Sequence, residues 1–208
     1  MTHDAFSDLV LFAVCIGLAI WNLPARREQA GLGIACLVIG LAALLGVIRF
    51  SDWDPYHHRA LGPHRFAATF ASVGAFPVLA YSLAYPESPL SKRLSGAWWL
   101  TFVVGGFGMA IWLLGFKLWA QIVPVLSGLW IASSIATGYR DRNPWLGTVG
   151  IVFLFASFAV TLSGPAAVRV LGIFTTTQMF HYFLATALCL IAVSNTKQRG
   201  TAEGSRSS

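Results

Sequence analysis

Charge is the property that this sequence most lacks. Only 11% of its 208 residues are Asp, Glu, Lys or Arg, whereas 56% are hydrophobic and the mean hydropathy is +0.68. A soluble domain carries about 25% charged residues, so this chain has too few charges to cover a water-exposed surface of its size. These values exclude an ordinary soluble protein and indicate that lipid surrounds most of the chain.

Several functional classes are excluded by residues that are missing. The chain has no Gly-rich phosphate-binding loop, and its last apolar stretch has no lysine that could carry retinal as a Schiff base. We expect all eight acidic residues to lie in loops or tails, which argues against a proton or ion pathway through the membrane. The three cysteines fall inside apolar runs and are expected to be small buried hydrophobic residues.

The basic residues do not indicate a nucleic-acid-binding protein, although the net charge is +6. They sit in short loops between apolar runs, where charges that orient a membrane protein are found. We therefore predict no nucleic-acid partner. The partner that the composition does predict is the lipid bilayer.

Seven apolar stretches are each long enough to cross about 30 Å of hydrocarbon as a helix. Between residues 97 and 137 the only charged residue is Lys117, and a single helix of that length would be about twice the membrane thickness. We therefore predict a tight reversal at 115–117. The sequence predicts an all-α, polytopic, seven-transmembrane-helix bundle with spans near 6–22, 31–50, 66–85, 97–115, 118–137, 145–162 and 169–193.

The distribution of basic residues predicts the orientation of the bundle. Nine of the 14 lysines and arginines fall in the loops of one side and in the C-terminal tail, and five fall on the other side. Because cytoplasmic loops are enriched in Lys and Arg, we predict that the N-terminus lies outside and the C-terminus lies in the cytoplasm. The predicted domains are a transmembrane domain, 1–196, and a disordered cytoplasmic tail, 197–208.

His181 is the histidine that the predicted spans place deepest in the membrane. Together with Thr177, Gln178 and Tyr182 it forms a polar stripe at three- and four-residue spacings, which must face other helices or a wet cavity. One interpretation is a neutral histidine that hydrogen-bonds between helices. The other is a metal-binding or acid–base role, because an ionisable group inside a span is a candidate for function.

A second polar cluster occupies the predicted loop 51–65. It contains Asp52, His57, His58 and His64, and imidazole and carboxylate groups are zinc ligands. The spacing matches no standard zinc motif, and a loop whose charges pair with one another is the alternative. If the loop folds into the bundle, these four residues and His181 become candidate metal ligands, with Asp52 and His181 as the catalytic candidates.

Two short stretches carry a resemblance to known membrane proteins. The end of the second span, 41–49, and Phe180-His181-Tyr182 in the seventh resemble a group of seven-helix bacterial proteins related to the CREST-type membrane hydrolases, the alkaline ceramidase superfamily. The resemblance covers the topology of most of the chain and individual residues only in these stretches. It implies a location in the bacterial inner (plasma) membrane.

The resemblance also implies a zinc-dependent hydrolase of lipid amides, in which histidines of spans two and seven and an aspartate hold the metal. His181 matches this pattern, and Asp52 is the match for the aspartate. Arg49 stands where a span-two histidine is expected, and Ala185 replaces a second histidine one turn after His181. We therefore expect a non-catalytic or diverged member that binds a lipid, a ligand or a membrane-protein partner, with the zinc hydrolase as the alternative.

Overall fold

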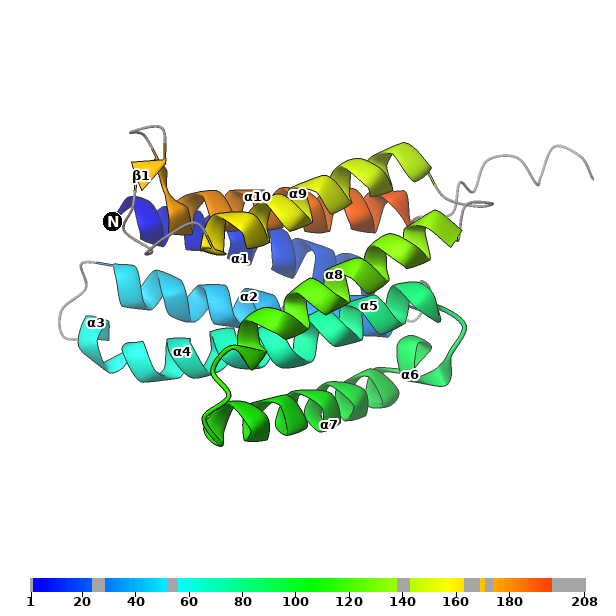
Figure 1. Ribbon diagram of the computed structural model, residues 1–208, viewed down its shortest axis with the longest axis horizontal. Coiled ribbons are helices and arrows are strands. Elements are labelled where there is room, and N and C mark those ends of the chain that lie inside the picture. Colours follow the sequence, from blue (N-terminus) through cyan, green and yellow to red (C-terminus); the bar gives the residue numbers. More distant parts are fainter. Residues whose placement is uncertain are drawn as a thin grey trace, which may run out of the picture.

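The computed structural model describes residues 2–23, 29–51, 56–137, 143–162, 169–170 and 174–195, and long helices dominate it (Figure 1). The prediction of an all-α bundle with seven apolar spans is confirmed within these residues, so the protein is an integral membrane protein. The spans are α1 (His3–Asn22), α2 (Ala30–Phe50), the continuous segment Leu61–Ala84, α7 (Leu94–Leu113), α8 (Trp119–Thr137), α9 (Pro144–Leu162) and α10 (Thr176–Ser194).

The third span is a composite of three helical segments. It begins as α4 (Leu61–Phe70), widens into the π-helical turn η1 (Ala71–Ala75) and continues as α5 (Phe76–Ala84). Pro77, at the start of α5, has no backbone N–H, and a proline ring crowds the carbonyl four residues before it. The π turn therefore lies where the proline interrupts regular α-helical bonding, and such turns are frequent at functional sites.

Two short helices and one reversal complete the connections. They are α3 (Tyr56–Arg59) before α4 and α6 (Pro89–Lys92) before α7. The reversal predicted between spans four and five is confirmed, and Gly115 adopts a φ of 106° there. Since side chains with a Cβ are disfavoured at positive φ, glycine is the residue that this turn requires.

The seventh span begins later than the sequence predicts. Strands β1 (Arg169–Val170) and β2 (Phe174–Thr175) form a small antiparallel pair, and α10 starts only after them. The start is set by a capping box, in which Thr175 Oγ1 accepts from the Gln178 N–H and Gln178 Oε1 accepts from the Thr175 N–H. The described residues of the two strands are therefore outside the helix.

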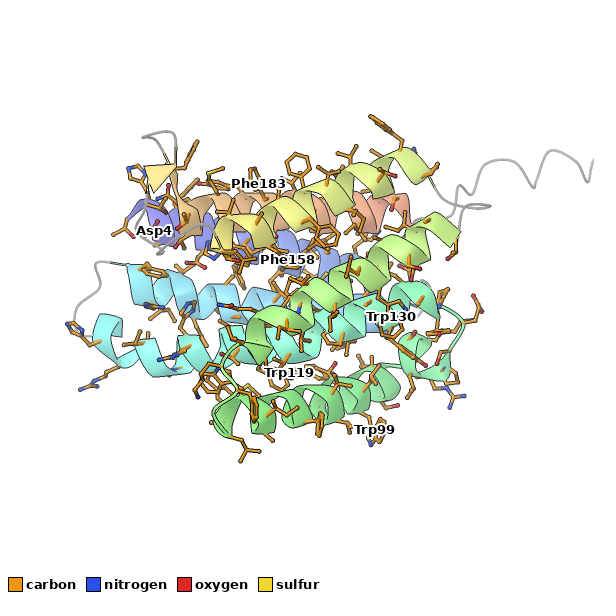
Figure 2. All side chains as sticks on the ribbon, in the orientation of Figure 1. Asp4, Trp99, Trp119, Trp130, Phe158 and Phe183 are labelled. Carbon is orange, nitrogen blue, oxygen red and sulfur yellow. The ribbon has the colours of Figure 1, made fainter. Side chains whose placement is uncertain are left out.

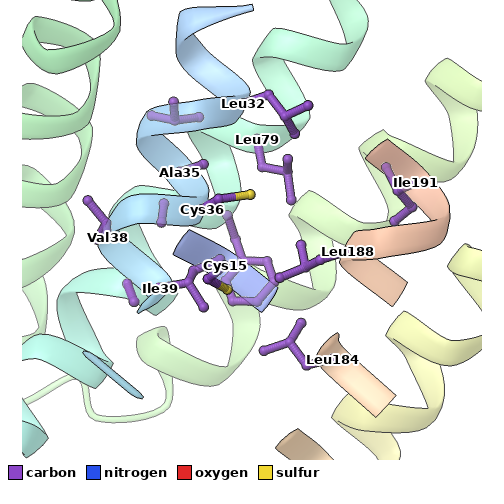
Figure 3. Packing of buried hydrophobic residues seen from close by; sticks show 14 of the residues in the cluster. Cys15, Leu32, Ala35, Cys36, Val38, Ile39, Leu79, Leu184, Leu188 and Ile191 are labelled. Atoms are coloured by element: carbon purple, nitrogen blue, oxygen red, sulfur yellow. The ribbon is translucent and has the colours of Figure 1, made fainter. Parts of the chain in front are cut away.

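The core of the bundle lies between the first two and the last helices. Residues of α1, α2, α5 and α10 pack there with almost no exposed surface (Figure 3). Cys15 and Cys36 are part of this core and both are free thiols, in agreement with the interpretation of the cysteines as small hydrophobic residues. By contrast, α7 lies at the edge of the bundle, and Trp99 on its outer side is 60% exposed (Figures 1 and 2). That surface faces lipid.

Orientation across the membrane stays a prediction of the charge distribution. The tail predicted at 197–208 lies outside the described residues, as does the loop 24–28 that carries two of the arginines used for the prediction.

Candidate metal and ligand site

An aspartate lies buried inside the first helix, which the sequence analysis did not anticipate. Asp8 belongs to the second turn of α1 and has 0% of its surface exposed. The expectation that all acidic residues lie in loops or tails is therefore wrong for Asp8 and for Asp4, one turn before it. A buried carboxylate is expensive unless a cation or hydrogen-bond donors compensate it.

Asp8 faces His181 of the seventh span. The distance between His181 Nε2 and Asp8 Oδ1 is 3.4 Å, and His181 is 7% exposed. This separation is longer than an ordinary N–H···O hydrogen bond. Neither carboxylate oxygen of Asp8 has a hydrogen-bond partner among the described residues. Two groups that could share a proton or a cation thus lie opposite one another without a direct bond.

The hydrogen-bond network determines which nitrogen of His181 carries the proton. Ser7 Oγ donates to the carbonyl oxygen of Asp4 at 2.8 Å, so its single hydrogen is used there. With that hydrogen on Asp4, we assign His181 Nδ1, 3.0 Å from Ser7 Oγ, as the donor of their hydrogen bond. In this tautomer of the neutral ring Nε2 presents its lone pair to Asp8, so two acceptors face each other when Asp8 is ionised.

His64 has the same protonation pattern. Its Nδ1 is 3.3 Å from the carbonyl oxygen of Ala42, which can only accept, so Nδ1 donates and Nε2 keeps its lone pair. Metal-binding histidines almost always donate their other ring N–H to a neighbouring acceptor, because that bond fixes the ring and its tautomer. Both His64 and His181 have this arrangement.

The N-terminal ends of α1 and α10 are joined by a second network that holds His181 in place. Asp4 Oδ1 accepts from Thr175 Oγ1 at 2.9 Å and from Gln178 Nε2 at 2.7 Å. The same two residues form the capping box of α10, so the start of α10 and the first turn of α1 are fixed together. His181 follows Gln178 by less than one turn, and its ring is thereby held beside Asp8.

Gly46 of α2 provides the space for the carboxylate. A Cβ atom at this position would lie 2.5 Å from Asp8 Oδ1 and 2.7 Å from Asp8 Oδ2. Such distances are shorter than real Cβ contacts, so any larger residue at position 46 must displace the carboxylate. The small residue therefore determines where Asp8 can place its oxygen atoms.

Two adjacent cavities open around this cluster. Asp8, His64 and His181 line a small cavity of about 120 Å³. A larger one of about 560 Å³ lies next to it between α4, α8 and α9, which is within the range of small-molecule pockets. The two cavities share five lining residues: His64, Ala68, Ser72, Phe76 and Phe180. The larger cavity therefore lies directly against the polar cluster, with these five residues as the common wall.

The structure brings together only some of the residues that the sequence predicts for the site. The structure brings His64 and His181 to one cavity, whereas His58 is exposed on α3. Asp52 and the side chain of His57 lie outside the described residues. Arg49 lines the larger cavity, and Ala185 is buried one turn after His181.

Asp8 and Ser7 are the site residues that sequence reasoning missed. A signal was present, because Asp8 lies in the apolar run 6–22 and Asp4 is one helical turn before it. Two acids on one face of a span must turn that face toward polar partners, and the polar stripe around His181 is the complementary surface.

The donor atoms around Asp8 fit a metal ion in part. Two ligands at about 2.1 Å from a tetrahedral zinc ion are about 3.4 Å apart, which matches the separation of His181 Nε2 and Asp8 Oδ1. The Asp8 carboxylate, which has no hydrogen-bond partner in the described residues, and the two Nε2 atoms supply the donor types that zinc takes. Among the described residues, no three such groups are close enough together to bind one ion. To complete a three-ligand site, His64 would have to move toward Asp8 and His181.

Comparisons with known proteins give no relative for this chain. No protein-family model, no curated protein and no solved structure matches it. The function must therefore be inferred from the chain's own residues and their geometry.

Proposed function

We propose that this integral membrane protein is a zinc-dependent hydrolase of lipid amides, with Asp8, His181 and His64 as its metal ligands. The proposal depends on one observation: a fully buried carboxylate without a hydrogen-bond partner in the described residues faces the lone pair of a buried imidazole. A cation between them removes both the desolvation cost of the carboxylate and the repulsion between two acceptors. Three protein ligands and one open position are the usual composition of a catalytic zinc site.

Zinc bound there would supply a water molecule that ionises near neutral pH and would polarise the carbonyl group of a substrate. The protein residues orient and shield the site. Ser7 and the carbonyl group of Ala42 hold the two imidazole rings, and Phe76 and Phe180 line both cavities. Ser7 itself is not a nucleophile in this arrangement, because its hydroxyl group donates to the carbonyl oxygen of Asp4.

The larger cavity supports a lipid substrate. Most of its walls are apolar, and it is lined by α8 and α9, two spans that also expose large hydrophobic side chains. A lipid can enter it from the bilayer without crossing water. The relationship to CREST-type hydrolases and the location in a bacterial inner membrane are part of this proposal, supported by the resemblance around His181.

A second candidate function is that of a non-catalytic lipid-binding bundle or partner subunit. It is favoured by the absence of three converging donors in the described part of the chain and by alanine at position 185. In that case Asp8 and His181 form only a structural polar pair, and the larger cavity binds a ligand without reaction.

Metal analysis of the purified protein distinguishes the two candidates. After equilibration with zinc-buffered detergent solution, we expect about one zinc ion per chain, measured by inductively coupled plasma mass spectrometry. His181→Ala and His64→Ala should lose it, because each removes a ligand. His3→Ala, an exposed histidine of α1, is the matched control and should keep it.

The same measurement tests the loop histidines. His58→Ala should retain the zinc, since His58 is exposed on α3. Loss of zinc in His58→Ala together with retention in His64→Ala would assign the third ligand to the loop instead. No zinc in the wild-type protein would end the proposal and leave the non-catalytic function.

Gly46→Ala is expected to weaken zinc binding by about 10- to 100-fold, the effect typical of losing the support of a metal ligand. The reason is that the new Cβ must displace the Asp8 carboxylate. Gly17→Ala in α1 is the control, because a Cβ there meets no atom within 4 Å. Zinc titration with a competing chelator measures both variants, and equal affinities in wild type and Gly46→Ala would show that Gly46 does not position the carboxylate.

A further inference from the structure

The larger cavity has a polar end that the proposed hydrolysis does not use. Arg49 of α2 and Arg65 of α4 both line it, together with His64 and Gln121. Most of the other lining residues are apolar, with Phe158 and Leu162 of α9 among them. The cavity thus combines two cationic groups with mostly apolar walls, as a site for an amphiphile does.

Arg49 interacts electrostatically with Asp8, but neither guanidinium group forms a close ion pair with an acid in the described residues. Neither has a carboxylate within 4 Å there, and both instead lie near aromatic rings. The Arg49 guanidinium carbon is 4.6 Å from the centre of the Phe50 ring, and that of Arg65 is 5.7 Å from the Trp112 ring. Lys117 Nζ, 3.8 Å from the same indole, adds a third positive charge at this end of the bundle.

An arginine at the end of a span often only extends toward the phosphate groups of bulk lipid. These two arginines differ because they line a cavity that adjoins the cavity of Asp8 and His181 and shares five lining residues with it. Guanidinium groups bind carboxylate and phosphate with paired, charge-assisted hydrogen bonds. The positions therefore match a ligand whose acidic group is near its reactive linkage.

We propose that the ligand of this cavity is a membrane amphiphile with an acidic head group, held by Arg49 and Arg65, whose acyl chain lies along α8 and α9. This inference rests on the proposed function only in taking the larger cavity as the substrate site. The inference specifies the substrate class, which is a lipid amide or ester with a carboxylate or phosphate group. That acidic group lies next to the bond to be hydrolysed, and this bond lies beside His64.

Binding of two matched probes tests the inference. N-palmitoylglycine and N-palmitoylethanolamine share the acyl chain and the amide group but differ in charge. We expect wild-type protein in neutral detergent, measured by displacement of a fluorescent fatty acid, to bind the anionic probe at least about 10-fold more tightly. That ratio is the effect of one charge-assisted hydrogen bond at a partly exposed site.

Variants assign the preference to the two arginines. Arg49→Gln/Arg65→Gln should reduce it to less than about 2-fold, and the double lysine variant, Arg49→Lys/Arg65→Lys, should restore part of it because the charge remains. Arg59→Gln, exposed on α3 at the same end of the bundle and outside the cavity, is the control and should keep the full preference. Equal binding of both probes by the wild type, or an equal loss in Arg59→Gln, would overturn the inference.

Two further measurements distinguish a lipid site from a site for free anions and from the zinc site. Inorganic phosphate at millimolar concentration should not displace N-palmitoylglycine, and displacement would mean a site for free anions, which contradicts the inference. Zinc content is measured on the same samples. A preference for the anionic probe without bound zinc supports the inference and refutes the hydrolase. Bound zinc without a preference for the anionic probe supports the hydrolase and refutes the inference.

Discussion

Asp8→Asn is expected to raise the thermal stability of the metal-free protein while it removes zinc binding and hydrolysis. The carboxylate of Asp8 is buried without a hydrogen-bond partner in the described residues, so it destabilises the folded protein. The carboxamide of the variant has the same shape and can donate to His181 Nε2. We expect a gain of about 1–3 kcal/mol, the cost typical of an unsatisfied buried polar group.

Asp4→Asn provides the control with the opposite sign. The Asp4 carboxylate accepts hydrogen bonds from Thr175 and Gln178, so the variant loses charge-assisted bonds and should unfold at a lower temperature. Thermal unfolding in detergent with a zinc chelator compares the two variants with the wild type. If Asp8→Asn destabilises the chelated protein as Asp4→Asn does, the carboxylate of Asp8 is stabilising and the metal-site argument fails.

Added zinc should make the wild type more thermally stable than Asp8→Asn, which reverses their order in the metal-free state. A ligand that binds only the folded state stabilises it in proportion to the logarithm of its concentration relative to the dissociation constant. The wild type should therefore gain stability with added zinc and the variant should not. Hydrolysis of a lipid amide by the variant should fall by more than about 100-fold, because a direct ligand matters more than the groups that support it.

Gly74→Ala is expected to have the largest effect on folding. A Cβ at this position of η1 would lie 2.9 Å from the Cα of Gly105 in α7, a contact between two backbones that no side-chain rotation can relieve. Close backbone approach at small residues is the main way in which membrane helices associate. We expect α7 to be pushed away and the free energy of unfolding to fall by about 1–3 kcal/mol, as for overpacked cores.

Gly106→Ala is the matched control for this substitution. It lies next to Gly105 in α7, but a Cβ there meets no atom within 4 Å. Its unfolding midpoint in detergent should equal that of the wild type within error. A Gly74→Ala protein that unfolds at the wild-type midpoint would show that the packing of α7 against η1 is not tight.

Each span could be predicted because the bilayer requires every helix, separately, to be apolar and long enough to cross it. An apolar stretch of sufficient length must satisfy its own backbone hydrogen bonds, whatever its neighbours are. The turn at Gly115 follows from the same reasoning, since the stretch around it is too long for one span. The predicted start of the last span at 169 was too early, because capping by Thr175 and Gln178 is decided by local hydrogen bonds and not by hydropathy.

The polar site could be predicted only in part. His181 was identified because it is a single ionisable group deep in a predicted span, and His64 because it belongs to a histidine-rich segment. Asp8 was missed although the predicted span 6–22 contains it, because all acidic residues were expected to lie in loops or tails. Its importance depends on burial beside His181, and a pattern along one helix does not contain that information.

By itself, the sequence determined that this protein is a bundle of seven helices in a membrane, since hydropathy and length act on each segment independently. Only the tertiary structure decided that Asp8 of α1, His64 of α4 and His181 of α10 meet at one cavity. The physical reason is that lipid is as apolar as the helix surfaces, so the choice of neighbouring helices depends on close packing at small residues such as Gly46 and Gly74 and on a few hydrogen bonds.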